Sequence, residues 1–214
     1  ITVDLNRPLV SGTMLGEVAP EQLLMTAGAR VGDGVLLVKA VPIEGTALIA
    51  LERAEILRQR GYEADFIRRT QNFLHEPGIS VVAPALLATE IAEVHAMHDP
   101  TEGGIMTGLL EMGRGAGVGL RIDLDRIPIV PEGAALCREF GLDPLGTIAS
   151  GAILMTVAAA DEARLCAELS AYGYPTTLIG RVTAADEGLV ALRGGQPVAW
   201  PLFATDEITK IFSG

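Results

Sequence analysis

The sequence predicts an α/β fold in which helices flank one mixed sheet in layers. Short apolar runs bounded by Gly, Pro or Asp are typical of buried strands. They alternate along the chain with longer segments in which apolar residues recur every three or four positions, as in helices. The order of these segments has a partial ferredoxin-like character. With 214 residues, of which 49% are hydrophobic, the chain has enough apolar material for one large domain.

The first half of the chain is expected to form three strands and five helices. Residues 35–41 are a nearly continuous apolar run between Gly34 and Pro42, the pattern of a strand buried on both faces. In 44–60 the apolar residues follow a helical period, and Gly61 provides a C-cap. The expected strands are 9–18, 35–41 and 93–98, and the expected helices are 20–27, 44–60, 63–75, 79–89 and 101–113.

The second half continues the alternation. The expected strands are 118–124, 152–158, 176–182 and 189–192, and the expected helices are 131–140, 161–172 and a terminal helix over 205–212. No linker interrupts residues 19–195, so we expect one domain over 19–214, preceded by a strand that belongs elsewhere.

Composition excludes some classes of function. The net charge of −11 argues against a nucleic-acid partner, because phosphate backbones are bound by basic surfaces. No apolar run reaches the roughly 18 to 20 residues of a membrane span, and the start of the chain lacks a signal-peptide pattern, so we expect a cytoplasmic protein without a membrane partner. Cys137 and Cys166 lie on apolar helical stretches and are predicted to be buried free thiols.

The segment His-Asp-Pro-Thr-Glu-Gly-Gly at 98–104 is the most informative motif. One interpretation is local: Asp99 is a helix N-cap, Pro100 occupies the first helical position and Glu102 completes a capping box. This interpretation leaves the two glycines unexplained, since each costs a helix about 1 kcal/mol relative to Ala. Glycines there let another group approach free N–H donors, so the alternative is a phosphate or metal-phosphate site at a helix N-terminus.

Two further turns are candidate sites. Glu44, Gly45 and Thr46 connect a buried strand to a helix N-terminus, which places a second possible anion site along the same edge of the sheet. Ser150 and Gly151 precede a strand and are a weaker candidate for phosphate or substrate binding. No histidine pattern supports a Ser-His-Asp arrangement around this serine.

The remaining polar residues allow alternative interpretations. His95 and His98 are three apart on a strand and point to opposite faces, so they are not expected to share a metal; His98 borders the turn, whereas His95 is more typical of a packed or surface histidine. Five arginines lie among acidic residues in 52–69, which is typical of a solvated helical face. The alternative is that one or two of them reach a substrate phosphate.

These segments, in this order, resemble the C-terminal domain of the aminoimidazole ribonucleotide (AIR) synthetase superfamily. The superfamily includes the purine enzyme, formylglycinamide ribonucleotide amidotransferase, selenophosphate synthetase, thiamine monophosphate kinase and a hydrogenase maturation protein. The matching pieces lie between residues 15 and 193 and are Leu15-Gly16-Glu17-Val18, Gly32-Asp33-Gly34 with the following strand to Lys39, Glu44-Gly45-Thr46-Ala47, His98 to Gly104, Ser150-Gly151 and Leu178-Ile179-Gly180-Arg181-Val182.

The resemblance implies a dimeric, two-domain, ATP-dependent enzyme acting on a small molecule. In it, the N-terminal domain carries most of the ATP site, and the C-terminal domain binds substrate phosphate or a Mg²⁺-bridged phosphate. It implies that Asp99 is a Mg²⁺ ligand, that His98 and Thr101 are its polar neighbours, and that Gly103 and Gly104 hold phosphate. The chemistry implied is phosphorylation of a substrate oxygen or amide.

Within the superfamily, the chain is most similar to the hydrogenase maturation protein and its synthetase-like relatives. It departs from the maturation protein by ending Ile211-Phe212-Ser213-Gly214 instead of in cysteine, and by having Ser150 in place of a glutamate, so cyanide-ligand chemistry is not expected. Because the first residue is Ile1, residues 1–18 are predicted to be the last strand segment of a preceding ATP-binding domain. The chain alone is then expected to be inactive; the alternative is a non-catalytic anion-binding or dimerisation module.

Overall fold

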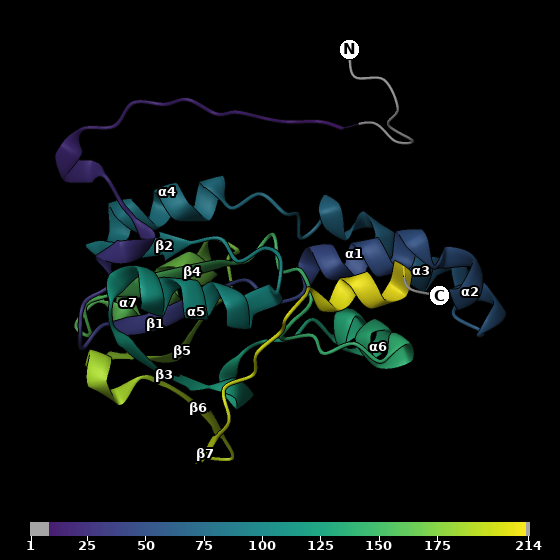
Figure 1. Ribbon diagram of the computed structural model, residues 1–214. Coiled ribbons are helices and arrows are strands. Elements are labelled where there is room, and N and C mark those ends of the chain that lie inside the picture. Colours follow the sequence, from purple (N-terminus) through teal and green to yellow (C-terminus); the bar gives the residue numbers. More distant parts are fainter. Residues whose placement is uncertain (1–8, 213–214) are drawn as a thin grey trace.

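A computed structural model describes residues 9–212 and confirms the α/β class, with a seven-stranded mixed sheet between helices (Figure 1). The strand order is β2-β4-β1-β5-β3-β6-β7. β3 and β6 pair in parallel, and the other neighbouring pairs are antiparallel. The strands are β1 Gly34–Val38, β2 Val94–His98, β3 Gly119–Asp123, β4 Ile153–Val157, β5 Thr176–Thr183, β6 Leu189–Arg193 and β7 Gln196–Val198.

Each face of the sheet has its own core, because side chains alternate along the central strand β1. Val35 and Leu37 pack with α5 (Gly104–Ala116) on one face. Leu36 and Val38 pack with α4 (Val82–Ile91) and α7 (Glu162–Ala171) on the other. All five residues of β1 are buried, which is the outcome that the continuous apolar run predicts.

A group of helices extends beyond one end of the sheet (Figure 1). It is built around a third apolar cluster that includes Ile49, Leu57, Ile67 and Leu136. The helices are α1 Ile43–Glu52, α2 Ala54–Gln59, α3 Ala64–Gln71 and α6 Pro131–Phe140, with the terminal 3₁₀ helix Glu207–Phe212 lying beside them. The helical group meets the sheet where β1 leads into α1, so this strand-to-helix turn lies at the junction of the two parts.

Several predicted elements differ from the structure. Residues 9–18 form no strand, since they find no pairing partner among the described residues, and residues 1–8 of the predicted 1–18 segment lie outside them. The expected helix 20–27 is two 3₁₀ turns, Pro20–Gln22 and Thr26–Gly28. The 44–60 helix is interrupted at Arg53, where φ is −116° and ψ is 19°, so the chain turns between α1 and α2. The expected helix 63–75 ends its α-helical part at Gln71 and continues as the 3₁₀ turn Asn72–Leu74.

The two cysteines are unbonded thiols, as expected. Cys137 is fully buried in the third cluster, and burial raises the pKa of its thiol to about 11. Cys166 is only partly buried, and burial raises its pKa as well. Among the helices of residues 9–212, none has both the length and the apolar character required to cross a bilayer.

Candidate functional site

The loop 143–151 joins the predicted site segments, and its first contacts are with the start of α1. The N–H of Glu44 donates to the Ser150 carbonyl over 3.4 Å, and the N–H of Gly45 donates to the Ile148 carbonyl over 3.2 Å. The N-terminus of α1 is therefore capped by backbone carbonyls of this loop, and two predicted site segments that are about a hundred residues apart in sequence lie side by side.

The same loop also contacts the start of α5. The N–H of Ala149 donates to the Thr101 carbonyl over 3.3 Å, and the N–H of Met106 donates to the Leu145 carbonyl over 3.3 Å. All three predicted segments, at 44–46, 98–104 and 150–151, are thus brought together around loop 143–151. Sequence patterns pointed to the three segments separately but gave no sign of the loop that unites them.

The local capping interpretation of Asp99 is wrong. Helix α5 begins at Gly104, and its N-cap is Gly103, whose φ of 77° is left-handed. Gly104 is also left-handed, with φ of 66°, and its N–H donates to the Thr101 carbonyl in a turn that precedes the helix. These two left-handed residues start the helix later than the sequence pattern predicts, which leaves Asp99 in the exposed turn before it.

The two glycines have an intramolecular explanation. A Cβ on Gly104 would lie 2.5 Å from the Leu145 carbonyl oxygen, so this position must be glycine for loop 143–151 to pack against α5. The N–H of Gly103 donates to Asp206 Oδ2 over 2.7 Å. The donors that sequence reasoning assigned to a phosphate are therefore already engaged within the chain, and phosphate binding by these glycines stays a prediction.

His98 is held in place at the end of β2. Its Nδ1 lies 3.3 Å from the Thr26 hydroxyl, and its Nε2 lies 3.1 Å from a Glu111 carboxylate oxygen. Asp99, Thr101 and Glu102 are exposed. The Glu102 carboxyl accepts hydrogen bonds from the Glu102 backbone N–H and from the Thr101 side chain, and these bonds lower its pKa. The turn therefore presents carboxylates and a hydroxyl to solvent beside a partly buried, fixed imidazole.

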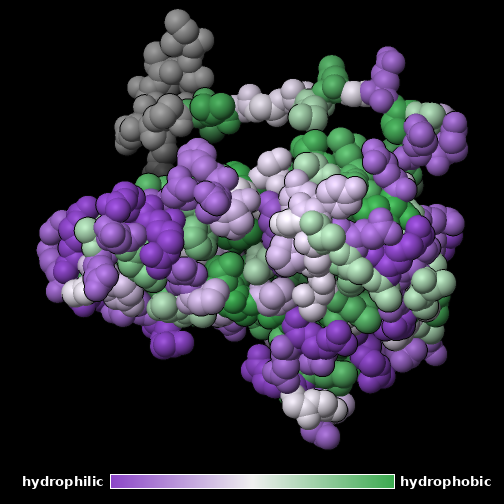
Figure 2. Space-filling model, turned by 180° about the vertical axis from the view of Figure 1, so that it is seen from behind, coloured by the Kyte–Doolittle hydropathy of each residue, from purple (hydrophilic) through white to green (hydrophobic). Residues whose placement is uncertain are grey.

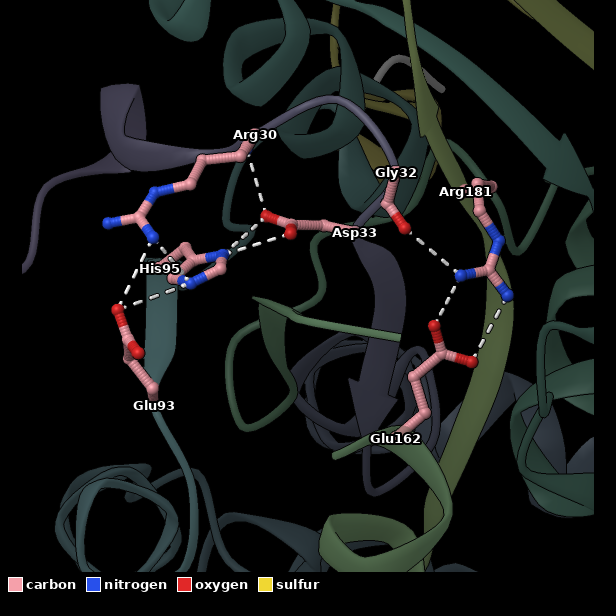
Figure 3. A network of polar contacts seen from close by, with 7 residues as sticks. All are labelled: Arg30, Gly32, Asp33, Glu93, His95, Glu162 and Arg181. Atoms are coloured by element: carbon pink, nitrogen blue, oxygen red, sulfur yellow. Dashed lines mark hydrogen bonds and ion pairs between the residues drawn. The ribbon is translucent and has the colours of Figure 1, made fainter. Parts of the chain in front are cut away.

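His95 belongs to a separate polar network that sequence reasoning did not find (Figure 3). Its Nδ1 lies 2.9 Å from both carboxylate oxygens of Asp33, which is almost fully buried. Arg30 approaches His95 Nε2 over 2.9 Å, and its backbone N–H donates to Asp33 over 2.9 Å. His95 is thus a packed histidine with partners different from those of His98, as expected. The pair Gly32-Asp33 before the apolar strand was the signal available in the sequence.

A second carboxylate holds the same turn from the other side (Figure 3). Glu162 pairs with Arg181 through both of its carboxylate oxygens, and Arg181 also donates to the Gly32 carbonyl over 3.1 Å. Since Glu162 is buried and paired, its role is to fix the start of β1.

Lys39 is a buried cation just after β1, and sequence reasoning assigned it no role. Its φ of 64° is unusual for a residue with a side chain. The ammonium donates to the carbonyls of Gly78 and Ser80, each over 2.9 Å, and burial lowers its pKa. Lys39 therefore ties the segment before α4 to the junction of β1 and α1.

The arginine-rich segment 52–69 fits the interpretation that it forms a solvated helical face. Four of its arginines form ion pairs with carboxylates at the surface of the helical group, namely Arg58 with Glu55, Arg60 with Glu139, Arg68 with Asp65 and Arg69 with Glu132. Because these guanidinium groups already have partners, the structure favours a surface role over phosphate binding.

Comparison with known proteins identifies the fold family. Residues 30–192 match the family described as AIR synthase related protein, C-terminal domain. The chain belongs to this family. The match confirms the resemblance that the motifs indicated, and the AIR synthase related domain extends from the Asp33 turn to β6.

Several relatives of this AIR synthase related domain are carbamoyl dehydratases. HypE of Rhizobium leguminosarum bv. viciae is 31% identical over 190 residues, covering 86% of this chain and 51% of the relative. The crystal structure of E. coli HypE has a TM-score of 0.69 at 21% identity, covering 88% of this chain and 55% of that one. A HypE structure in complex with ATP has a TM-score of 0.64 at 19% identity, covering 90% and 57%. The chain spans about half the length of the curated relatives it matches.

Proposed function

We propose that this chain is the phosphate- and substrate-binding half of an ATP-dependent AIR synthase related enzyme that phosphorylates a substrate oxygen or amide. The observation that carries the proposal is the convergence of the α1 and α5 N-termini on loop 143–151, beside the exposed edge of Asp99, Thr101 and Glu102. The first N–H groups of both helices are engaged within the chain, so the exposed edge is the part of this junction that is open to a ligand. The ATP complex of a HypE relative supports the use of ATP.

The charges at this edge favour a phosphate that arrives with a cation. Asp99, Glu102 and Glu111 are exposed carboxylates at or near the turn, and the Asp206 carboxylate offsets the positive end of α5. Residues 9–212 contain no group of three His, Cys, Asp or Glu side chains that could hold a metal. A magnesium–phosphate complex usually takes only one or two carboxylates from a protein, a requirement that Asp99 fits. When bound, Mg²⁺ would neutralise charge on the transferred phosphoryl group.

The chain's own residues then divide the work. Asp99 contributes a carboxylate, Thr101 a hydroxyl, and His98, fixed by Thr26 and Glu111, an imidazole beside them. Gly103 and Gly104 place the positive end of α5 behind the turn. We assign contact with the substrate to the other side of loop 143–151, where the segments 44–46 and 150–151 meet.

We also propose that a preceding ATP-binding domain of the same polypeptide covers the exposed apolar surface, and that the enzyme is a homodimer. Leu9, Val10, Met14 and Leu15 are each more than 80% exposed. Figure 2 shows that apolar side chains of the N-terminal segment project away from the rest of the molecule. Val82 and Leu86 on α4 are exposed as well. Apolar patches of this kind mark surfaces that another unit covers. The cytoplasmic location remains a prediction.

The proposal is tested with Asp99→Ala in the full-length enzyme. We expect at least a 100-fold loss of Mg²⁺-dependent ATP turnover. Because Asp99 is not the helix cap, we expect less than about 0.5 kcal/mol of change in unfolding free energy by urea denaturation. Asp65→Ala is the matched control, since it removes an exposed aspartate whose ion pair with Arg68 lies on the distant α3. Turnover that survives the Asp99 substitution would show that the turn takes no part in the reaction.

A further inference from the structure

The C-terminal segment 199–212, which we call the strap, crosses from the end of β7 to the helical group and passes the start of α5 (Figure 1). Ile208 and Ile211 anchor its end in the third apolar cluster. Earlier along the strap, the Phe203 ring packs on Gly146 of loop 143–151. The strap therefore touches the loop that unites the candidate site.

One side chain of the strap connects three segments. The Asp206 carboxylate accepts hydrogen bonds from the N–H of Gly103 over 2.7 Å, of Ile148 over 3.1 Å and of Ile208 over 2.8 Å. Asp206 is only 8% exposed. A buried carboxylate that accepts several N–H groups at a helix N-terminus makes short, charge-assisted bonds. The α5 cap, loop 143–151 and the strap are therefore fixed relative to one another through a single group.

The neighbouring residue Glu207 holds the same loop through hydrogen bonds of its own. Its Oε2 accepts from the N–H of Asp143 over 2.9 Å and pairs with Lys210, and its own N–H donates to the Gly146 carbonyl over 3.1 Å. Glu207 secures the first part of loop 143–151, whereas Asp206 alone reaches the Gly103 N–H. Glu207 therefore attaches the strap to loop 143–151, whereas Asp206 also contacts the turn at Gly103.

We propose that Asp206 is a positioning residue for the turn 98–104. By accepting from the Gly103 N–H, it holds that residue in its left-handed conformation and occupies the α5 cap, so a substrate phosphate meets the exposed Asp99 edge and not the Gly103 amide. This inference rests on the proposed function for its catalytic consequence, but the hold on Gly103 is independent of it.

The kinetic test compares Asp206→Asn with Glu207→Gln in the full-length enzyme. Both substitutions remove one strap carboxylate, but only the first removes the charge at the α5 cap. We expect Asp206→Asn to lower kcat at least tenfold while KM for ATP stays within twofold, and Glu207→Gln to change kcat less than threefold. Asp206→Glu, which keeps the carboxylate, is expected to recover part of kcat. Equal losses of kcat in the Asn and Gln variants would overturn the proposal, since the strap would then act only as a support.

Amide hydrogen exchange tests the role of Asp206 independently of ATP turnover, and its main comparison uses the wild-type chain. In the wild-type chain, the Gly103 and Ile148 amides should exchange with deuterium at least 100-fold more slowly than the amide of the exposed residue Thr101. In Asp206→Asn, the Gly103 amide proton should move upfield and exchange faster. Rapid exchange at Gly103 in the wild-type chain would refute the hold by Asp206. Slow exchange in an enzyme without ATP turnover would contradict the proposed function and leave the hold intact.

Discussion

Gly104 and Gly117 lie at the two ends of α5, and both are left-handed, with φ of 66° and 65°. Their surroundings differ. A Cβ on Gly104 would meet the backbone of 145–147 at 2.5 to 2.9 Å, whereas a Cβ on Gly117 would meet nothing within 4 Å. Substituting each of the two glycines therefore distinguishes the free-energy cost of a left-handed Ala from the cost of displacing loop 143–151 from α5.

We therefore expect Gly117→Ala to destabilise the chain by about 1 kcal/mol, which is the strain of a left-handed Ala. Gly104→Ala should cost about 3 kcal/mol or more, because a backbone contact must also open. Urea denaturation of the two variants at pH 7 measures the difference. If both lose the same free energy, loop 143–151 is not packed tightly against α5.

Cys137 makes stability depend on alkaline pH. Burial raises its pKa from the ordinary value of 9.0 to about 11, so the unfolded thiol ionises before the folded one. This contribution is fully present below pH 9 and is lost as the pH rises through 11; a two-unit difference corresponds to about 2 to 3 kcal/mol. In urea denaturation from pH 8 to 11, Cys137→Ala should show a shallower fall in stability than the wild-type chain. Cys166→Ala should show a smaller change in the same direction, because Cys166 is only partly buried. Parallel curves for the wild-type chain and Cys137→Ala would contradict the burial argument.

At the scale of elements, sequence patterns predicted those helices and strands whose local pattern agrees with their burial in the folded chain. The run that became β1 is apolar on both faces because helices cover both faces, and the pattern records this burial directly. The predicted start of α5 was wrong because its local pattern disagrees with the tertiary contacts. Asp99 and Glu102 satisfy a capping pattern, but the cap comes from Asp206, about a hundred residues further along the chain. Local spacing carries no information about such a partner.

One predicted strand is not formed, and one observed strand was not predicted. Residues 9–18 have apolar residues of the right kind, but a strand requires a neighbour to accept its hydrogen bonds, and the described chain provides none. β7 was missed because it has only three residues, all exposed. Its signal was the pair Gly194-Gly195, whose φ values of 57° and 73° form the tight turn between β6 and β7. A two-glycine turn after an apolar run is a hairpin signature.

At the scale of the whole molecule, the sequence located the segments of the candidate site but not their assembly. Segments 44–46, 98–104 and 150–151 each had a glycine at a turn, which is a local signal. Their union depends on loop 143–151, on the strap and on Asp206, and these contacts connect residues far apart in the chain. The contact between Asp33 and His95 also depends on the folded sheet, which places β1 and β2 on either side of β4.

The proposed assignment of ATP binding to a preceding domain predicts how the isolated chain binds nucleotide. The candidate site has an exposed carboxylate edge. The buried ammonium of Lys39, after β1, donates to two carbonyls, and the Gly103 amide donates to Asp206. A polyanion therefore finds little to offset its charge on this chain, whose net charge is −11. We expect isothermal titration calorimetry with Mg-ATP to give a dissociation constant weaker than about 100 μM for the chain alone, corresponding to less than about 5.5 kcal/mol of binding free energy. The full-length enzyme should bind at least tenfold more tightly. Sub-micromolar affinity in the isolated chain would place the nucleotide site within residues 1–214 and overturn the assignment of ATP binding to a preceding domain.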